Sequence, residues 1–521
     1  MSAHKFVPML SRRQMLQGFA AVAASSVLSG CGATIYRAVS SPTNPQTAPT
    51  PPSTTPSTPQ AVVNPQPLPI GSIMAASMTV AANSVGSFDD GFVGLSYEKE
   101  TLYMPLFTGA NSDLIGLFGR LGNSVLRIGG NSVDENVWTP EGKGQTSGQI
   151  APSDVDALAS FLQATGWTCI YGVNLGGSAT GATTPALAAA EVSYVVQKLG
   201  RSLVGIEIGN ECENYRDPGS FYQNNWTVEM FETLWLQYHA AIVALTPNAP
   251  ICGPAAGSNV DGWTIPFGEY VTDKKINLLT QHYYRGPGTA STATLADLIS
   301  PDAALISELA QLKDGAESIG VPFRMAECNS YWSGGTAGVS NAYASSLWAI
   351  DMIFNCALGG AVGVNFQGGN RGTYTPIADN QGTVVGPQPV FYGLLMAALA
   401  GQGTLLSTDL SAGSLNVTSY AVKNSDGGMS LVIVNKDETQ NLDLSIALPA
   451  AMTSATLLAM TQLSAGATAP SLSALSGMTI QGATVATDGA FNPGTAYGLT
   501  VSGKQLSCYV PALSAVLIQL A

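Results

Sequence analysis

Residues 204–215 read VGIEIGNECENY, an apolar run that stops abruptly at an amide and a carboxylate. The run Gly-Ile-Glu-Ile before the break is typical of a strand that is buried on both faces, as in a parallel sheet. A buried strand that ends by presenting Asn210 and Glu211 side by side indicates that its last residues line a site rather than a core. The segment therefore bears on both the fold and the chemistry of the chain.

Seven further segments have a similar strand-like pattern, and segments with a helical pattern separate them. The helical stretches include residues 154–166, 183–200 and 229–245, which have apolar residues at helical spacing and Gly or Pro just beyond their ends. Strands that are each followed by a helix lie parallel and are buried on both faces. Eight such units predict an α/β fold, a (β/α)8 TIM barrel over residues 89–402. The predicted strands are 92–98, 124–130, 169–176, 204–211, 250–257, 276–284, 322–329 and 363–369.

The sequence pattern changes after the predicted barrel. Helical periodicity fades, and short β-rich runs such as LNVTSYAVK and GMSLVIVNK appear, separated by turn signals such as SDGG at residues 425–428. Residues 403–521 are therefore predicted to form a β-sandwich. Residues 72–88, ahead of the first barrel strand, are predicted to add a strand to that sandwich.

The charge balance of the chain excludes one broad class of partner. Twenty Lys and Arg stand against 34 Asp and Glu, so the formal net charge is −14 over 521 residues. Nucleic acid binding needs a basic surface, and we therefore expect no nucleic acid partner. A small anion such as an acidic sugar is not excluded, because a few local donors are enough to hold it.

Residues 1–31 have the pattern of an export signal. Residues 11–16 (SRRQML) resemble a twin-arginine signal, and the apolar stretch 18–28 is too short to span a bilayer as a stable helix. The segment ends in LSGC, which resembles a bacterial lipobox, so Cys31 either carries a lipid or is incidental to ordinary cleavage nearby. Residues 32–71, rich in Pro, Thr and Ser, are predicted to be an extended linker. We expect an exported protein, periplasmic or at the cell surface, and tethered to the membrane if Cys31 is lipidated.

Cysteine and histidine are too sparse and too scattered for a zinc pattern. Beyond Cys31 there are six cysteines without CxxC spacing, and the chain has three histidines: His4, His239 and His282. We therefore expect no metal and no other cofactor, and we interpret the cysteines as small buried hydrophobic residues. His282 is interpreted as an orienting or packed residue rather than as a proton shuttle.

Polar residues gather where the predicted strands end. In such a barrel the C-terminal ends of the strands line the active site. Glu211 ends the fourth strand and Glu327 the seventh, so the two carboxylates can face each other across the barrel mouth. Paired carboxylates suit glycosidic bond hydrolysis, in which one donates a proton to the leaving oxygen and the other attacks the anomeric carbon. Other strands end in Tyr97-Glu98, Arg127 to Asn131, Asn174 and His282-Tyr283-Tyr284.

Two residues near these carboxylates have side chains that suit glycosidic bond hydrolysis. An arginine near the nucleophile keeps it ionised, and Arg127 is the candidate. The amide of Asn210 can donate to the sugar 2-hydroxyl. A lone Asn-Glu pair is common, and the alternative is that Glu211 and Glu327 are ordinary surface carboxylates. Eight strands in phase, with the two acids on the fourth and seventh, favour the catalytic interpretation.

At this point the chain resembles the clan A glycoside hydrolases, retaining barrels with the acid/base on the fourth strand and the nucleophile on the seventh. More narrowly it resembles glycoside hydrolase family 79, which holds bacterial β-glucuronidases and heparanase. The resemblance covers residues 75–521. It is carried by VLRIGG (125–130), VGIEIGNECENY (204–215), QHYY (281–284), AECNSYWSGG (326–335), GGNRGTY (368–374) and FYGLLMAALAG (391–401).

The resemblance implies roles for the residues around the two carboxylates. Glu211 corresponds to the acid/base and Glu327 to the nucleophile. Asn210 corresponds to the ligand of the 2-hydroxyl, and Glu98 to an acidic residue that holds distal sugar hydroxyls. We expect no metal or cofactor to take part in this chemistry.

The resemblance also implies a site for a uronate carboxylate. Tyr284, or alternatively Tyr283, corresponds to the tyrosine beside the nucleophile. Gly334, Gly335 and Tyr374 correspond to the group that binds the carboxylate through backbone N–H groups and a phenol. This mode of binding needs no Arg or Lys, so it is compatible with an acidic protein.

Some positions depart from the family pattern or stay open. Cys212 follows the acid/base where many clan members have proline, and residues 330–332 (SYW) leave the register of the carboxylate-binding loop open. Arg371 either adds charge near the substrate or is a solvated loop residue. Trp332 either stacks on a sugar ring or packs against the protein. Asn131, like Arg127, is a further candidate for substrate contact.

We therefore predict a retaining β-D-glucuronidase that acts at chain ends on a β-glucuronide. A different clan A glycosidase, such as an arabinofuranosidase or xylosidase, and an endo-acting, heparanase-like enzyme are the alternatives. A carbohydrate-binding protein with an inactive barrel is a further alternative, and the intact pair of glutamates argues against it. The sequence indicates neither the aglycone nor the oligomeric state.

Overall fold

The structure, a computed structural model, describes residues 72–369 and 372–521, which belong to one compact unit. The predicted export segment with Cys31, the predicted linker up to residue 71, and Arg371 lie outside the described residues. None of the helices in the described ranges combines the length and the apolarity that a bilayer crossing requires.

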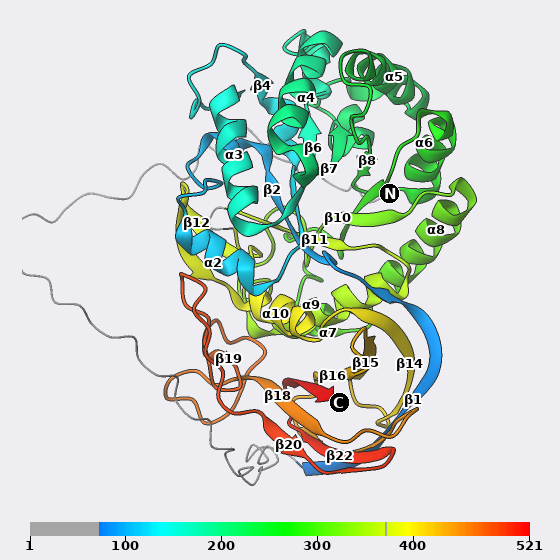
Figure 1. Cartoon of the computed structure of the whole chain (residues 1–521), viewed down its shortest axis with the longest axis vertical. Coiled ribbons are helices and arrows are strands. Elements are labelled where there is room, and N and C mark those ends of the chain that lie inside the picture. Colours follow the sequence, from blue (N-terminus) through cyan, green and yellow to red (C-terminus); the bar gives the residue numbers. More distant parts are fainter. Residues whose placement is uncertain (1–71, 370–371) are drawn as a thin grey trace, which may run out of the picture. The chain divides into compact units, whose positions relative to one another are not determined.

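Eight parallel strands form a closed barrel (Figure 1). Their order is β7-β6-β3-β2-β11-β10-β9-β8, and a bridge between Ile206 and Ile251 closes the cylinder. Nearly every strand residue is buried, because helices cover the outside of the sheet and side chains fill its inside. The predicted barrel is confirmed. Its strands are β2 Val93–Glu98, β3 Val125–Gly129, β6 Thr168–Val173, β7 Leu203–Ile208, β8 Gly253–Ala256, β9 Leu279–Tyr284, β10 Phe323–Asn329 and β11 Val364–Gly368.

The helices begin and end at residues suited to those positions. The Thr184 side chain accepts the N–H of Leu187 at the start of one helix, and Gly166 ends another in the left-handed conformation at φ 74°. The helices are α2 Ser112–Arg120, α3 Pro152–Thr165, α4 Pro185–Leu199, α5 Val228–Leu245, α6 Ile265–Tyr270, α7 Leu295–Ile299, α8 Ala303–Ile319, α9 Tyr343–Leu358 and α10 Pro389–Leu399.

Short 3₁₀ turns follow four barrel strands and form much of the surface at the C-terminal end of the barrel. Three of these strands, β3, β6 and β7, end earlier than the sequence predicts. Strand β7 ends at Ile208, three residues before Glu211, because Gly209 at φ 86° and Glu211 at φ 46° leave the extended conformation. Asn210 and Glu211 therefore lie on the turn beyond the strand. The turns are η1 Lys99–Tyr103, η2 Asn131–Glu135, η3 Gly176–Thr180 and η5 Cys212–Arg216.

The rest of the chain forms a large, mostly antiparallel sheet that curls (Figure 1). Hydrogen bonding runs through β19-β18-β23-β16-β15-β14-β1-β17-β22-β21, with β20 beside β18. The predicted β-rich second domain is confirmed, and its strands form one continuous sheet rather than two separate ones. They share a hydrophobic core of their own around residues such as Leu431, Ile446 and Ile518.

One strand of this sheet comes from before the barrel. Strand β1 pairs antiparallel with β14 and parallel with β17. The strands of the sheet are β1 Ser72–Phe88, β14 Gly403–Ser411, β15 Val417–Asn424, β16 Met429–Asn435, β17 Gln440–Ala447, β18 Ala455–Gln462, β19 Met478–Ile480, β20 Tyr497–Leu499, β21 Val501–Ser502, β22 Gln505–Val510 and β23 Ser514–Leu520. Two smaller strand pairs are β4 Val137–Trp138 with β5 Gln149–Ile150, and β12 Ile377–Asn380 with β13 Thr383–Pro387.

Helix α9 joins the barrel to the second sheet. The phenol of Tyr343 donates to the carbonyl oxygen of Leu513 at 2.9 Å. The Asp351 carboxylate accepts from the phenol of Tyr420 at 2.8 Å and forms an ion pair with Lys436. Directed contacts of this kind between partly or fully buried groups fix the sheet against the barrel.

Candidate active site

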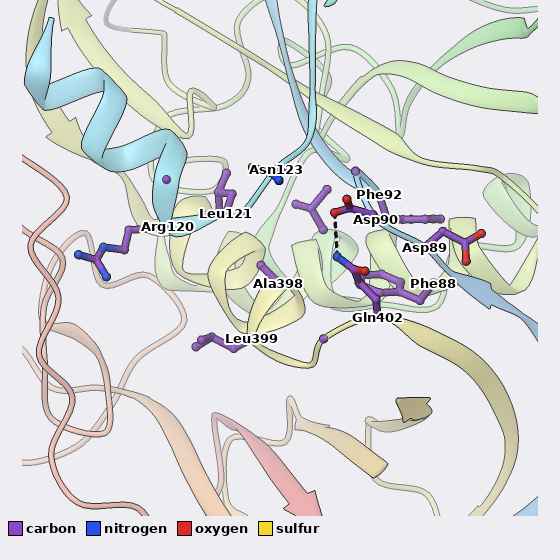
Figure 2. A pocket seen from close by; sticks show the side chains of 15 residues that line it. Phe88, Asp89, Asp90, Phe92, Arg120, Leu121, Asn123, Ala398, Leu399 and Gln402 are labelled. Atoms are coloured by element: carbon purple, nitrogen blue, oxygen red, sulfur yellow. Dashed lines mark hydrogen bonds between the residues drawn. The ribbon is translucent and has the colours of Figure 1, made fainter. Parts of the chain in front are cut away.

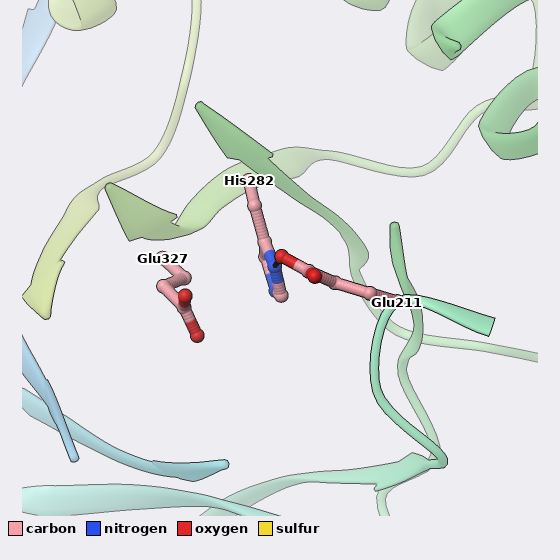
Figure 3. Close-up of side chains that lie close together, drawn as sticks. All are labelled: Glu211, His282 and Glu327. Atoms are coloured by element: carbon pink, nitrogen blue, oxygen red, sulfur yellow. Dashed lines mark hydrogen bonds and ion pairs between the residues drawn. The ribbon is translucent and has the colours of Figure 1, made fainter. Parts of the chain in front are cut away.

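Two glutamates face each other at the C-terminal end of the barrel. Glu211 follows β7, and Glu327 lies on β10. Together with His282 of β9, each offers one nitrogen or oxygen atom, and these three atoms lie within 4.8 Å of one another. Figure 3 shows the three side chains converging from separate segments. Carboxyl groups about 5 Å apart allow one to attack a sugar carbon directly, whereas a gap of about 6.5–9.5 Å leaves room for a water.

The carboxylate of Glu327 is held by two donors. Nη1 of Arg127 donates to Oε2 at 2.8 Å, and the phenol of Tyr284 donates to Oε1 at 2.8 Å. Glu327 is buried, and both of its oxygens are oriented. Donors of fixed geometry hold a carboxylate in the orientation from which it can attack a sugar carbon.

Arg127 connects several groups of the site. It is fully buried on β3, and besides Glu327 it donates to Oε2 of Glu207 at 2.7 Å and to Oδ1 of Asn210 at 2.8 Å. Burial by itself lowers the pKa of the Arg127 guanidinium, but the Glu207 and Glu327 carboxylates outweigh this effect and raise the pKa. Arg127 therefore stays charged and holds side chains from three regions of the barrel together.

The contact with Arg127 also orients Asn210. Because Oδ1 of Asn210 accepts a hydrogen bond from Arg127, the amide NH₂ group is left as the donor. The residue is buried and directly precedes Glu211. An amide donor in this position can bind a hydroxyl of a sugar that lies between the two glutamates.

The carboxyl group of Glu211 lies against His282 and Gly257. Nδ1 of His282 is 3.1 Å from Oε1, and the Asn214 amide donates to Oε2 at 3.2 Å. A Cβ atom on Gly257 would fall 2.7 Å from the carboxyl carbon of Glu211, so glycine permits the approach. The φ of 46° at Glu211 is uncommon for a residue with a side chain, and such strain is typical of functional sites.

The imidazole of His282 is neutral. It is fully buried, and burial lowers its pKa to about 4, although the nearby Glu327 carboxylate acts in the opposite direction. A neutral imidazole has one N–H, and when Glu211 is ionised Nδ1 is the atom that donates to it. His282 thus orients the Glu211 carboxyl group, which is one of the two interpretations that the sequence left open.

Glu98, at the end of β2, brings a third carboxyl group close to the pair. It accepts hydrogen bonds from the Ser132 N–H at 2.8 Å and from the Gln367 amide at 3.2 Å. Burial and the Glu327 charge raise the pKa of Glu98 to about 7. A Cβ on Gly130, which has φ 74°, would lie 2.4 Å from the Glu98 carboxyl carbon, so only glycine leaves room there. Near neutral pH, Glu98 can therefore both accept from and donate to a hydroxyl.

Tyr284 and Tyr374 form a pair of phenols near Glu327. Their ring centroids are 6.1 Å apart. Burial and the Glu327 charge raise the pKa of both phenols, so both remain protonated donors. Gly335 packs on Tyr374, since a Cβ there would lie 3.2 Å from the Tyr374 Cβ. Gly334 and Gly335 have φ values of 84° and 85°, which favour glycine at both positions.

Three candidate residues lie apart from this group. The Tyr283 phenol donates to Asp302 at the start of α8 at 2.8 Å, because alternate residues of a strand face opposite sides of the sheet. Tyr284, and not Tyr283, is therefore the tyrosine beside Glu327. Asn131 begins η2 and is exposed. Trp332 is 46% exposed on the loop after β10.

Two residues near the carboxylates were not singled out from the sequence. Gln367 is a polar residue one position before the end of β11 at Gly368, and polar residues near strand ends are the signal that identified the other candidates. Glu213 lies in the turn η5, is buried, and accepts the N–H of Gly257 at 2.5 Å. Burial and the Glu211 charge raise the pKa of Glu213 to about 8. A turn has no periodicity that would have indicated its burial.

The atoms of Glu211, His282 and Glu327 also have spacing compatible with metal ligands. Both oxygens of Glu327 already accept hydrogen bonds, one of them from the Arg127 guanidinium. A metal ion bound there would lie close to a fixed positive charge, which disfavours its binding. We therefore propose no metal ion at this site.

A separate pocket of about 220 Å³ lies at the opposite end of β2 (Figure 2). Its lining includes Asp89, Asp90, Arg120 and Gln402, and the Gln402 amide donates to Asp90 at 2.7 Å. Since Glu98 ends the same strand, this pocket is distinct from the carboxylate pair. We locate the candidate active site at the C-terminal end of the strands, where barrel enzymes carry their catalytic residues.

Comparison with known sequences finds two relatives. No model of a known protein family matches the chain. A β-glucuronidase of Aspergillus niger is 24% identical over 308 residues, and a β-glucuronidase of Neurospora crassa is 24% identical over 357 residues. The matches cover 52% and 58% of this chain, and 56% and 62% of the relatives' own length. The chain thus spans somewhat more than half of each relative.

Comparison with solved structures covers more of the chain. A 4-O-α-L-rhamnosyl-β-D-glucuronidase from Fusarium oxysporum 12S, solved as a Rha-GlcA complex, has a TM-score of 0.70 at 20% identity, covering 85% of this chain and all of that one. A GH51 arabinofuranosidase from Xanthomonas axonopodis pv. citri has a TM-score of 0.60 at 18% identity, covering 86% of this chain and all of that one. At these identities the likeness establishes the fold that they share, a parallel barrel with a β-rich second domain.

Proposed function

We propose that the chain is a retaining β-D-glucuronidase that removes glucuronic acid from the ends of its substrate. The observation that carries the proposal is the pair Glu211 and Glu327, which offer oxygens within 4.8 Å of each other at the barrel mouth. The names of the two relatives, both β-glucuronidases, and of the similar rhamnosyl-glucuronidase structure support the choice of sugar.

In the first half-reaction Glu327 acts as the nucleophile. Its carboxylate oxygen bonds to the anomeric carbon while the bond from that carbon to the leaving oxygen breaks. The Glu211 carboxyl group gives its proton to the leaving oxygen, so the aglycone departs as an alcohol. A glycosyl ester on Glu327 results. Arg127 and Tyr284 hold the attacking carboxylate in place, each at 2.8 Å.

Water completes the reaction. Glu211, now ionised, takes a proton from the water as the water oxygen bonds to the anomeric carbon and the ester bond to Glu327 breaks. Two displacements restore the original anomeric configuration. His282 orients the Glu211 carboxylate in this step. The Asn210 amide donates to the 2-hydroxyl, a contact that strengthens in the transition state.

The uronate carboxylate is proposed to bind beside Tyr374. The protonated phenol of Tyr374 and the N–H groups of the Gly334–Gly335 loop, which packs on it, supply neutral donors. Such donors bind an anion without Lys or Arg, in keeping with the acidic chain. Glu98 is proposed to hold the distal hydroxyls, because its raised pKa lets it act as donor or acceptor.

An arabinofuranosidase-type activity is the second candidate. The likeness to a GH51 arabinofuranosidase, at a TM-score of 0.60, favours it, and the same carboxylate pair serves a neutral sugar. Trp332, exposed on the loop after β10, is proposed to stack on the sugar or its aglycone in either case.

The signal pattern in residues 1–31, with Cys31 as the site of lipid attachment, supports an exported enzyme.

The protein is expected to prefer an aryl β-glucuronide over the matching aryl β-glucoside by at least about 100-fold in kcat/KM, because donors arranged for a carboxylate are left unpaired by a hydroxymethyl group. Tyr374→Phe keeps the ring but removes one donor, and is expected to reduce this preference by about 10-fold. Steady-state kinetics on both substrates measure the two ratios.

Tyr283→Phe is the matched control, because its phenol contacts Asp302 and not the site, and it is expected to leave the preference unchanged. An aryl α-arabinofuranoside and an aryl β-xyloside complete the panel. Wild-type protein that turns over a neutral glycoside better than the glucuronide would remove the uronate assignment and favour the second candidate.

A further inference from the structure

Glu213 takes no part in the chemistry above, although it lies only two residues beyond Glu211. It is buried, 3% exposed, within the turn η5. A buried carboxyl group needs hydrogen-bond partners. Its Oε1 atom accepts two backbone N–H groups, from Gly257 at 2.5 Å and from Ser258 at 2.8 Å. Glu213 therefore ties the turn after β7 to the turn after β8.

The turn that Glu213 holds is the one that packs on Glu211. A Cβ atom on Gly257 would lie 2.7 Å from both Cδ and Oε1 of Glu211 and 2.9 Å from its Cγ. The Gly257 backbone is therefore in direct contact with the carboxyl end of Glu211. The N–H of Glu211 also donates to the carbonyl oxygen of Ala255 at 2.8 Å, so this segment contacts the residue at its backbone as well.

The Glu211 carboxyl group is restrained by packing against Gly257 as well as by hydrogen bonds. Its contacts to His282 and Asn214 are 3.1 and 3.2 Å long, whereas both contacts that hold Glu327 are 2.8 Å long. Longer hydrogen bonds restrain a side chain less, so packing against Gly257 contributes to holding this carboxyl group in place.

We propose that Glu213 is a positioning residue for the acid/base: by binding the N–H groups of Gly257 and Ser258, it keeps their turn against Glu211 and so holds the Glu211 carboxyl group within reach of the leaving oxygen. The role of Glu211 in this statement rests on the proposed function, whereas the geometric step does not. Glutamine at position 213 keeps an acceptor oxygen in the same place. Alanine leaves both N–H groups without their acceptor.

Crystal structures of the wild type, Glu213→Ala and Glu213→Gln test the geometric step without any activity. In Glu213→Ala, residues 256–258 are expected to move, and the oxygens of Glu211 and Glu327, which lie within 4.8 Å of each other here, are expected to separate beyond that limit. The Gln variant is expected to retain the wild-type arrangement. An unmoved Glu211 in Glu213→Ala would overturn the proposal.

Leaving groups of different acidity test the chemical step. Phenoxide leaves a glucuronide only with proton donation, whereas 2,4-dinitrophenoxide leaves without it. Glu213→Ala is expected to lower kcat/KM about 10-fold or more on phenyl β-glucuronide and less than about 3-fold on the dinitrophenyl substrate, and Glu213→Gln to restore both. Gly257→Ala, whose methyl group displaces the Glu211 carboxyl directly, is expected to give the same pattern.

Glu232→Ala is the control, because it removes another buried glutamate, on α5, and is expected to affect both substrates equally. Equal losses on both substrates in Glu213→Ala would mean that Glu213 only stabilises the fold, and would overturn the proposal. Wild-type protein that is inert on both glucuronides would contradict the proposed function instead, and the crystal structures would then decide whether Glu213 positions Glu211.

Discussion

Glu327→Ala is expected to lower kcat on an aryl β-glucuronide by about 10⁴-fold or more, because it removes the oxygen that forms the covalent intermediate. Arg127 and Tyr284, which donate to that carboxylate at 2.8 Å, remain but have nothing to orient. Steady-state kinetics measure the loss, and circular dichroism shows whether the variant is folded.

Azide separates the roles of the two glutamates. In Glu327→Ala it can fill the vacated space and attack the anomeric carbon once, so the rescued product is the α-glucuronosyl azide. In Glu211→Ala it attacks the glycosyl ester on Glu327 and yields the β-azide. Glu308→Ala, a glutamate on the outer helix α8, is the control and is expected to remain fully active. Near-normal turnover by Glu327→Ala would refute the assignment of the nucleophile.

Arg127→Met is expected to reduce both stability and activity. The guanidinium donates to Glu207, Glu327 and Asn210 at 2.7, 2.8 and 2.8 Å, and all of these groups are buried. Removing one partner of a buried ion pair costs about 3–5 kcal/mol, because the remaining charge is left unpaired. We expect the free energy of unfolding at pH 7 to fall by about that amount in urea titrations. We expect kcat to fall by at least about 100-fold, because two substrate-facing groups lose their orientation.

A second buried arginine provides the control for Arg127. Arg324 lies near the other end of the barrel strand β10 and donates to Asn365 at 2.5 Å. Arg324→Met is expected to reduce stability without a comparable loss of kcat in the folded protein. Arg127→Lys keeps the charge but not the planar fork that reaches several acceptors, so an intermediate loss is expected. Folded Arg127→Met protein with wild-type kcat would contradict the account.

The barrel was predictable because each of its strands has a recognisable local sequence pattern. Runs such as VGIEI and GVNF consist mostly of apolar residues and glycine, and the segments between such runs carry helical periodicity with Gly or Pro at their ends. Strand ends were less predictable. The prediction carried the fourth strand to Glu211, but β7 stops at Ile208, because φ at Gly209 and Glu211 is positive and propensity alone does not reveal such turns.

The candidate site was predictable where function coincides with a strand end. Glu98, Glu211 and Glu327 all lie at or near the C-terminal end of a buried strand, and parallel strands in a barrel bring these ends together. The sequence did not predict which side chain at the end of β9 faces the site. Tyr283 and Tyr284 are consecutive, so only one of them can do so.

Contacts between turns that are distant in the chain could not be predicted from the sequence. Glu213 looks like a surface acid in a short polar stretch, and only the approach of the turn after β8 buries it. The contact of His282 with Glu211 likewise joins segments 71 residues apart in the chain. Such pairings depend on the register of the whole barrel, which local patterns do not specify.

The anomeric configuration of the first product tests the central claim most directly. Carboxyl groups whose oxygens lie within 4.8 Å predict double displacement. Proton NMR recorded in the first minutes of aryl β-glucuronide hydrolysis is therefore expected to show β-glucuronic acid before mutarotation produces the α-anomer. Initial release of the α-anomer would mean a single displacement by water and would contradict a covalent role for Glu327.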